Sequence, residues 1–263
     1  MLPFPQISPY IFELGPLKPT WYGMMYVVGF GLGYWAARYR ARHDPHWPQA
    51  LISDLLTYLM IGVIVGGRVG YVLFYGMGNW AKDWLYPLKI WEGGMSFHGG
   101  LLGVLIAMFF FARKHGKRYF EVTDFIAPLI PIGLFFGRIG NFINGELWGR
   151  ATDLPWGMVF PTGGSVARHP SQLYEALLEG LVLFVILWAY SGKPRAIGRT
   201  SGLFLIGYGV FRTAVEFVRE PDSHLRYLAF DWLTMGMVLS LPMIVFGLYL
   251  YLRPLPRAEE HPA

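Results

Sequence analysis

The stretch "GRIGNFINGELWGR" at residues 137–150 ends an apolar segment on two arginines, two asparagines and a glutamate. Residues 122–136 before it are mostly Ile, Leu, Phe and Pro. An arginine keeps its charge when partly buried, and its planar group binds phosphate through two parallel hydrogen bonds. These residues therefore predict a phosphate-binding site in hydrophobic surroundings.

A second polar group lies in "YGVFRTAVEFVRE" at residues 208–220. Arg212, Glu216 and Arg219 stand at i, i+4 and i+7, which places all three on one face of a helix. On that face Glu216 is placed to hold Arg212, and Arg219 is expected to remain free nearer the helix end. Arg138 and Asn141 share a face in the same way, at i and i+3.

The composition indicates where these helices lie. Hydrophobic residues make up 54% of the 263 residues and aromatic residues 17%, which predicts a membrane protein. The net charge of +5 comes from short basic runs between apolar segments, a pattern of cytoplasmic loops that argues against nucleic-acid binding. The chain has no cysteine, so any thiol in its chemistry must come from a substrate.

Windows of about 20 mainly apolar residues, the length that crosses a bilayer, predict an all-α polytopic fold with seven transmembrane helices. They cover residues 21–38, 51–75, 97–112, 122–143, 174–190, 202–218 and 231–252. We treat 1–263 as a single membrane-embedded domain, with 1–20 as an outer N-terminal arm without a removable signal peptide. Residues 144–173 are expected to form an outer loop region between spans four and five.

The basic residues set the orientation, because Lys and Arg are enriched in cytoplasmic loops. Twelve lie on one side: Arg38, Arg40, Arg42, Arg113, Lys114, Lys117, Arg118, Lys193, Arg195, Arg199, Arg253 and Arg257. Seven lie on the other: Lys18, Lys82, Lys89, Arg150, Arg168, Arg219 and Arg226. The amino terminus is therefore predicted outside (periplasmic) and the carboxyl terminus in the cytoplasm.

The remaining three basic residues, Arg68, Arg138 and Arg212, fall inside predicted spans. A charge at the centre of a membrane helix costs about 2.5–3.5 kcal/mol on insertion scales, so such residues favour a functional role. In this orientation the polar residues of the spans gather in the outer half of the membrane: Tyr22, Arg68, His98, Arg138, Asn141, Asn144, Glu146, Arg212, Glu216 and Arg219. That side is the expected site of chemistry.

Several of these residues have a simpler explanation. Arg68 could equally fasten helices by pairing with a carboxylate. His98 stands at a helix entrance, where a histidine is often a cap or an interfacial hydrogen-bonding group, and Tyr22 could be an interfacial anchor. Asp124 begins a span and is expected to cap it.

Four motifs together resemble bacterial prolipoprotein diacylglyceryl transferase. They are "GGMSFHGGLLG" at 93–103, "GRIGNFINGELWGR" at 137–150, "RHPSQLYE" at 168–175 and "SGLFLIGYGVFRTAVEFVREPD" at 201–222. The similarity runs from about Trp21 to Pro242 and keeps the motif order. It implies a multi-pass protein of the bacterial inner membrane, with an active site that faces the outer leaflet.

The resemblance implies transfer of the diacylglyceryl group of phosphatidylglycerol to the lipobox cysteine of a prolipoprotein signal peptide, with release of glycerol 1-phosphate. The family's essential arginines match Arg138 and Arg212. Its other important positions match Tyr22, His98, Asn141, Glu146, Gly149, Tyr208, Glu216 and Arg219. Arg68 and Asn144 join the candidate substrate contacts because they lie among the outer polar residues.

The expected chemistry needs a thiolate and a stabilised leaving phosphate. Arg138 and Arg212 are predicted to bind the phosphate, with His98 as the candidate general base. Alternatively, the positive field of the arginines lowers the pKa of the thiol without a dedicated base. We expect no cofactor and no metal, because His98 has no partner at ligand spacing.

A transporter or channel for an anionic solute is the alternative from another class, since intramembrane arginines also line such pathways. It predicts polar groups in both leaflets or two related halves with broken helices. The predicted inner half is apolar here, and the two halves of the chain differ.

Overall fold

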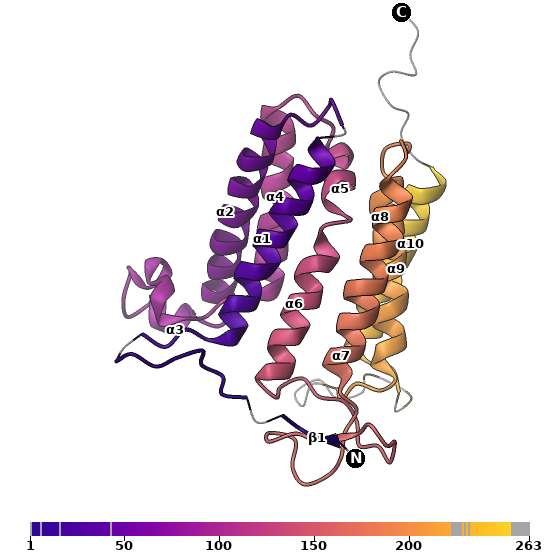
Figure 1. The fold of residues 1–263 in the computed structure, drawn as a ribbon. Helices are drawn as coiled ribbons and strands as arrows, with labels where there is room; N and C mark the ends of the chain where they lie inside the picture. Colours follow the sequence, from indigo (N-terminus) through magenta and orange to yellow (C-terminus); the bar gives the residue numbers. More distant parts are fainter. Residues whose placement is uncertain are drawn as a thin grey trace, which may run out of the picture. The chain divides into compact units, whose positions relative to one another are not determined.

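The computed structural model describes residues 2–5, 7–15, 17–42, 44–221, 228, 230 and 232–253, and it is mainly helical (Figure 1). Its helices form two compact units. One contains residues up to Ala36 and from Asp124 onward, and the other is Ala37–Thr123. Each unit is described by itself, and the single membrane-embedded domain remains a prediction.

Two long helices dominate the unit Ala37–Thr123. They are α2 (Gln49–Phe74) and α4 (Phe97–Lys114), and the short elements between them are α3 (Met77–Trp80), η1 (Tyr86–Leu88) and η2 (Ile90–Glu92). Glycines bring α2 and α4 together, since a Cβ on Gly66 would lie 2.4 Å from the carbonyl oxygen of Gly99. Small residues allow such close backbone approach between membrane helices.

The other unit holds most of the predicted site. Its elements are β1 (Leu2–Pro3), the start of α1 (Trp21–Ala41), the end of α5 (Tyr119–Ile126), α6 (Ile130–Ile143), β2 (Met158–Val159), α7 (Ser171–Glu175), the π-helix η3 (Ala176–Val182), α8 (Leu183–Ser191), α9 (Arg199–Glu216) and α10 (Met235–Leu252). Helices α7, η3 and α8 follow one another as one long helix with a π-helical middle. Within this unit, α6 and α9 end where α7 and α10 begin (Figure 1).

Four described helices are long and apolar enough to cross a membrane, namely α2, α4, the helix Ser171–Ser191 and α10. The pair α5 and α6 would make a fifth crossing with a bend of 48°. Pro128 lies at that break, where it cannot donate the backbone hydrogen bond that a continuous helix needs. The chain is thus a multi-pass helical membrane protein. Judged by length and apolar composition, its described helices give four or five spans, fewer than the seven predicted.

The helices α1 and α9 coincide with the first and sixth predicted spans but do not meet that apolar criterion. Helix α9 carries Arg212 and Glu216 in its length, and α1 ends on Arg38 and Arg40. The low hydropathy of α9 therefore comes partly from the residues that make it a candidate for function.

Asp124 does not cap its own helix, contrary to the sequence expectation. Its carboxylate accepts hydrogen bonds from the backbone N–H of Gly198 (2.7 Å) and of Ser201 (2.7 Å), and from the Ser201 hydroxyl (2.6 Å). It therefore caps the start of α9, which follows Gly198 in a left-handed conformation. This contact fixes the end of α9 opposite Arg212.

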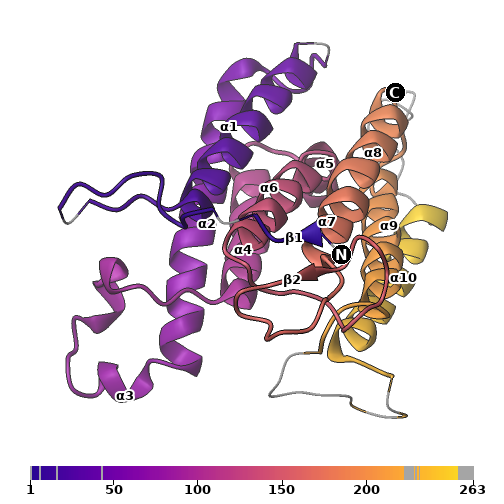
Figure 2. The ribbon, with the colours of Figure 1, turned by 60° about the horizontal axis from the view of Figure 1, so that its bottom comes forward.

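The first residues of the chain and the segment between α6 and α7 meet in a short parallel sheet. Leu2 and Pro3 of β1 pair with Met158 and Val159 of β2, and the two strands lie side by side in Figure 2. Phe4 packs against the rings of Phe142 and Phe160 at centroid distances of 5.3 and 5.1 Å. The N-terminal arm is thus folded onto the loop that follows α6.

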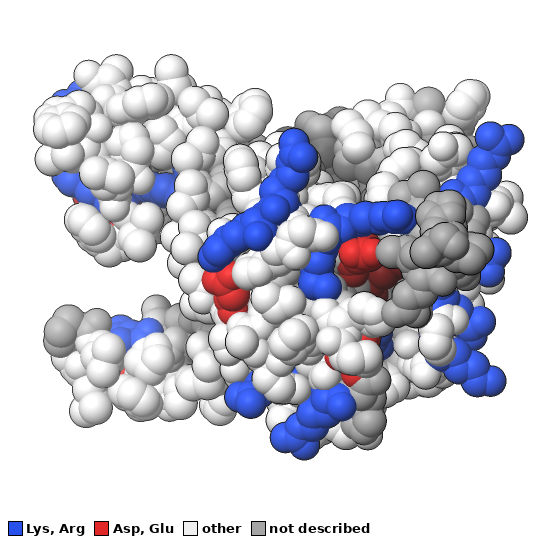
Figure 3. All heavy atoms as spheres, turned by 90° about the horizontal axis from the view of Figure 1, so that it is seen from above, with Lys and Arg blue, Asp and Glu red and all other residues white. Residues whose placement is uncertain are grey.

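Basic side chains gather at the ends of several helices. On the face that Figure 3 views, Lys and Arg side chains are more evident than Asp and Glu side chains. Helix α4 ends on Arg113 and Lys114, and Lys193, Arg195 and Arg199 lie between α8 and α9 or at the first residue of α9.

Candidate active site

Arg138 lies on α6, and its guanidinium group faces carboxylates from the neighbouring helix. Its Nε pairs with Glu175 of α7, and its Nη2 lies 3.9 Å from Glu179 of η3. Its Nη1 donates to the Asn141 side chain at 3.5 Å, one turn further along α6. The helices approach closely here because Gly180 leaves no side chain, and a Cβ on it would lie 2.7 Å from Phe135.

Helix α9 presents the other two arginines on the predicted face. Glu216 pairs with Arg212 at i, i+4 and lies 3.6 Å from Nη1 of Arg219 at i, i+3. The other oxygen of Glu216 accepts a hydrogen bond from Thr234, which begins α10. Glu216 is thus held by two helices, and Gly236 of α10 provides the space for its carboxylate.

Arg219 is not free, contrary to the sequence expectation. Besides Glu216, its Nε lies 3.9 Å from Glu175. Glu175 therefore bridges two helices, since it pairs with Arg138 on α6 and approaches Arg219 next to α9. The result is one line of alternating charges that runs Arg138, Glu175, Arg219, Glu216, Arg212.

Sequence reasoning missed Glu175 and Glu179 as members of this cluster. Neither carboxylate is among the site residues that the sequence predicts. Both are almost fully buried, at 1% and 0% exposure. The signal was present in "YEALLEGLVLF", because two carboxylates four residues apart in an apolar span need cations on neighbouring helices.

The polar residues that follow Arg138 form a hydrogen-bonded set. Asn141 donates to Glu146 at 2.9 Å and Asn144 donates to the same oxygen at 3.3 Å. The ring of Tyr22 packs on Gly140, where a Cβ would lie 2.9 Å from it, and its hydroxyl lies 3.0 Å from that of Tyr26. Tyr22 thus stands beside the turn of α6 that carries Asn141.

Tyr208 lies on α9 four residues before Arg212 and is half-buried. Its ring stacks on Phe204 at a centroid distance of 5.9 Å. It interacts electrostatically with both Arg138 and Arg212, so its hydroxyl lies near the two arginines. All of the predicted site residues except Arg68 and His98 therefore belong to one compact unit.

Gly149 and Arg150 connect the end of the long motif to the end of α9. A Cβ on Gly149 would lie 2.4 Å from the Val218 carbonyl oxygen, so only glycine fits between these segments. Arg150 donates to the carbonyl oxygens of Arg219 (3.0 Å) and Glu216 (3.2 Å). It thereby satisfies acceptors that a helix end leaves open, a role that the sequence did not indicate.

The loop before α7 is fixed by a second arginine. Arg168 lies over the Trp148 ring at 3.9 Å and donates to the carbonyl oxygen of Gly163 at 2.8 Å. The neighbouring His169 ring nitrogen lies 3.2 Å from the Tyr174 hydroxyl. Partial burial lowers the pKa of His169 below 6.5, because desolvation disfavours the charged imidazolium.

Arg68 and His98 belong to the unit Ala37–Thr123. Arg68 is buried and donates to backbone carbonyl oxygens of Pro87 (3.1 Å), Tyr86 (2.6 Å), Gly93 and Gly94 (3.3 Å). In the described part of the chain it forms no ion pair with a carboxylate, and its backbone acceptors lie in the connection between α2 and α4. Its role as a substrate contact remains a prediction.

His98 lies in the first turn of α4 and is exposed. The turn begins at Ser96, whose hydroxyl accepts from the Gly99 N–H at 3.2 Å and whose own N–H bonds to the carbonyl oxygen of Gly67 at 2.9 Å. Ser96 therefore caps α4, so the capping role that was one alternative for His98 belongs to Ser96. The role of His98 as a base remains a prediction.

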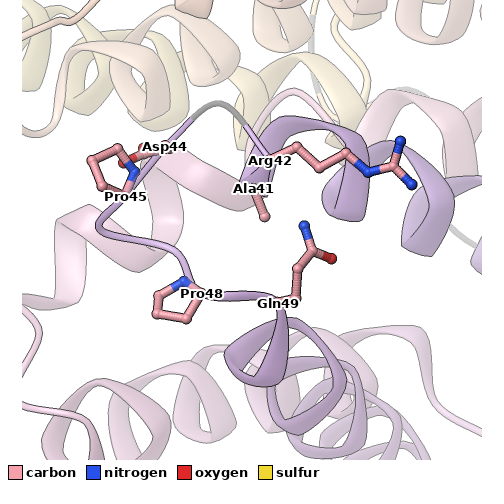
Figure 4. A pocket seen from close by; sticks show the side chains of 6 residues that line it. All are labelled: Ala41, Arg42, Asp44, Pro45, Pro48 and Gln49. Carbon is pink, nitrogen blue, oxygen red and sulfur yellow. The ribbon is translucent and has the colours of Figure 1, made fainter.

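An open pocket of about 560 Å³ lies between α1 and α2, at the end of α1 opposite Tyr22 (Figure 4). Its lining residues come from one loop and its flanks: Ala41, Arg42, Asp44, Pro45, Pro48 and Gln49. It contains none of the predicted site residues. The part of the chain that the structure describes also groups no three His, Asp or Glu side chains as a metal site would need.

The fold and the cluster define a class: a multi-pass helical membrane protein with a buried arginine–carboxylate network. The family model described as prolipoprotein diacylglyceryl transferase matches residues 9–253. The chain therefore belongs to the prolipoprotein diacylglyceryl transferase family.

Curated relatives cover nearly the whole chain, and each carries the name phosphatidylglycerol–prolipoprotein diacylglyceryl transferase. A protein of Nitratidesulfovibrio vulgaris (strain DP4) is 57% identical over 255 residues, 97% of each chain. One of Solidesulfovibrio magneticus is 58% identical over 259 residues, 97% of this chain and 98% of its own. One of Pseudomonas aeruginosa (strain LESB58) is 55% identical over 252 residues, 95% of this chain and 94% of its own.

Proposed function

We infer that this protein is a transferase that moves the diacylglyceryl group of phosphatidylglycerol to the lipobox cysteine of prolipoproteins. The observation that carries this conclusion is identity of 55–58% to transferases of that name over nearly the full length. The reaction is the first step of lipoprotein maturation. In this reaction the thiol comes from the prolipoprotein substrate, which agrees with the absence of cysteine from this chain.

In this reaction the cysteine sulfur attacks the glycerol carbon that bears the phosphoester. A carbon–sulfur bond forms and the carbon–oxygen bond to phosphate breaks, so that glycerol 1-phosphate leaves with the bonding electron pair. The thiol gives up its proton, because the thiolate is the nucleophile. The site must therefore stabilise negative charge that develops on the departing phosphate oxygen.

We assign phosphate binding and charge stabilisation to Arg138 and Arg212, which approach the same buried region from α6 and α9. Glu216 orients Arg212 through their ion pair, and Asn141 and Tyr208 are placed to orient lipid oxygens. The hydrogen-bonded set of Glu146 and Asn144 borders Asn141 on the same side.

We assign proton removal from the thiol to His98, at the exposed start of α4. An imidazole that is neutral near pH 7 is a suitable base for a thiol. The competing proposal is that the arginine field lowers the pKa of the thiol enough without a base. The two differ in the pH dependence that they predict for a His98 variant.

We also propose seven spans in the bacterial inner membrane, with the amino terminus and the active site on the outer side. Every predicted span coincides with a helix or a bent helix pair, which supports this count. The basic residues at the ends of α4 and α8 support a cytoplasmic position for those ends.

The test is mass spectrometry of a synthetic lipobox peptide after incubation with the purified protein and phosphatidylglycerol of defined acyl chains. We expect a mass gain of one diacylglyceryl group on the cysteine. Arg138→Ala should abolish the gain, whereas Arg113→Ala, an exposed arginine at the end of α4, should keep it. An unmodified peptide with folded, lipid-bound wild-type protein would contradict the transferase assignment.

A further inference from the structure

Glu179 is the least compensated charged group in the arginine–carboxylate cluster. Its side chain is fully buried, and neither of its carboxylate oxygens has a hydrogen-bond partner among the described residues. Its nearest cation is Nη2 of Arg138 at 3.9 Å, which is beyond hydrogen-bond distance. A bare carboxylate in such a place is costly, because burial penalises the ionised form.

The other two buried carboxylates have a cation in direct contact. The oxygens of Glu175, like those of Glu179, accept no hydrogen bond from the described residues, but one of them forms a close ion pair with Nε of Arg138. Glu216 pairs with Arg212 and accepts a hydrogen bond from Thr234. Each of these two carboxylates therefore has a closer positive charge than Glu179 has. Glu179 instead stands four residues after Glu175, whose negative charge acts on it unfavourably.

The charges of the cluster also have to match its ligand. Arg138, Arg212 and Arg219 carry three positive charges, and Glu175, Glu179 and Glu216 would carry three negative charges if all were ionised. A site with no net charge compensates a buried phosphodiester anion for its lost hydration less well than a site with one net positive charge. Removal of one negative charge would leave a net charge of plus one, equal and opposite to a phosphodiester.

We propose that Glu179 holds a proton and is a neutral carboxylic acid in the resting protein, so that the arginine cluster keeps one uncompensated positive charge for the substrate phosphate. The groups that face it are Arg138 from α6, Glu175 from α7, and Tyr208, Arg212 and Arg219 from the region of α9. Glu179 touches no substrate in this proposal. It is a positioning residue that sets the charge of the site.

The part played by the substrate phosphate rests on the proposed transferase function. If Glu179 sets the charge, the cluster is matched to a lipid phosphodiester with one negative charge. Ionisation of Glu179 at alkaline pH should then weaken lipid binding more than the chemical step. The KM for phosphatidylglycerol should rise with pH, while kcat should follow the thiol of the peptide.

The protonation state can be measured without any transferase assay. Infrared spectra of the purified protein should show a carbonyl band of a protonated carboxylic acid at neutral pH, which disappears on titration to alkaline pH. Glu179→Gln should remove the band and Glu179→Asp should displace it, whereas Glu175→Gln should leave it. A neutral-pH spectrum without a band assignable to Glu179 would overturn the proposal, whether or not the protein is active.

Kinetics give the second test, with Glu175→Gln as the matched variant one turn away. Glutamine mimics a neutral acid, so Glu179→Gln should keep turnover within about threefold at neutral pH and lose the alkaline rise of KM. In the wild type that rise should be about tenfold or more, as expected for one added charge near the phosphate. Glu175→Gln should lose far more activity, because an ionised partner of two arginines is removed.

A folded Glu179→Gln variant as inactive as Glu175→Gln would show that the ionised form is needed and would overturn the proposal. If the wild type fails to modify the peptide, the transferase assignment fails instead. The infrared result then still decides the charge of Glu179.

Discussion

Arg68 and Arg138 are both arginines inside membrane helices, but their guanidinium groups are satisfied in different ways. Arg68 donates to four backbone carbonyl oxygens of the connection between α2 and α4. Arg138 faces the carboxylates of Glu175 and Glu179 and the amide of Asn141. A carbonyl bonded to Arg68 cannot be exchanged without unfolding the loop, whereas a carboxylate can be exchanged for a phosphate of like charge.

The comparison separates two uses of intramembrane charge. Among the described residues no carboxylate pairs with Arg68, but two aromatic rings lie near it, with Tyr86 at 4.7 Å and Tyr71 at 5.9 Å. Such a site stabilises a fixed structure. Around Arg138 the cations and carboxylates alternate across three helices, so one pairing can change while the others hold the arginines in place.

The largest expected effect is on the arginines of the cluster. Arg138→Lys and Arg212→Lys keep the charge but lose the planar fork that binds phosphate through two bonds. We expect turnover to fall by about 10²–10³-fold in each, the usual effect of removing one oxyanion donor. The measurement is the initial rate of peptide modification. Lysine variants with wild-type rates would refute the model in which each arginine binds the phosphate through two hydrogen bonds. They would also remove the functional contrast between these arginines and Arg68.

His98 tests whether the unit that contains Arg68 also contributes chemistry. If His98 is the base, His98→Gln should lower kcat by about 10²-fold and remove the loss of activity at acidic pH. The matched control is His46→Gln, at an exposed position in the loop after α1. Retention of both the rate and the acidic limb in His98→Gln would favour activation of the thiol by the arginine field alone.

Arg68 itself is expected to matter for stability. Arg68→Met would leave buried carbonyl oxygens without donors, at about 1–3 kcal/mol for each group that stays unsatisfied. We expect a clear fall in the thermal unfolding temperature in detergent, partly restored in Arg68→Lys, which can reach fewer acceptors. A rise in the KM for phosphatidylglycerol without a loss of stability would instead support the hypothesis that Arg68 contacts the substrate.

The sequence predicted the positions of the helices well, because apolar length and charge spacing are local properties. Arg212, Glu216 and Arg219 share a face as their spacing requires, and they pair there. What the spacing could not supply is which helices are neighbours. The bridge from Glu175 to Arg138 and Arg219, and the cap that Asp124 gives α9, depend on residues far apart in the chain.

The smallest expected effect concerns His169, outside the spans. Burial lowers its pKa in the folded protein below 6.5, so the unfolded chain binds the proton more readily. Stability should therefore be independent of this group above about pH 6.5 and should fall as the pH decreases from there to the folded pKa. We expect a change of about 1–2 °C in the unfolding temperature, absent in His169→Gln. An unfolding temperature that rises on acidification only when His169 is present would contradict this sign. Such a result would mean that the loop beside the cluster stabilises the charged imidazolium of His169. The contrast between fixed and exchangeable charge would then extend beyond the helices.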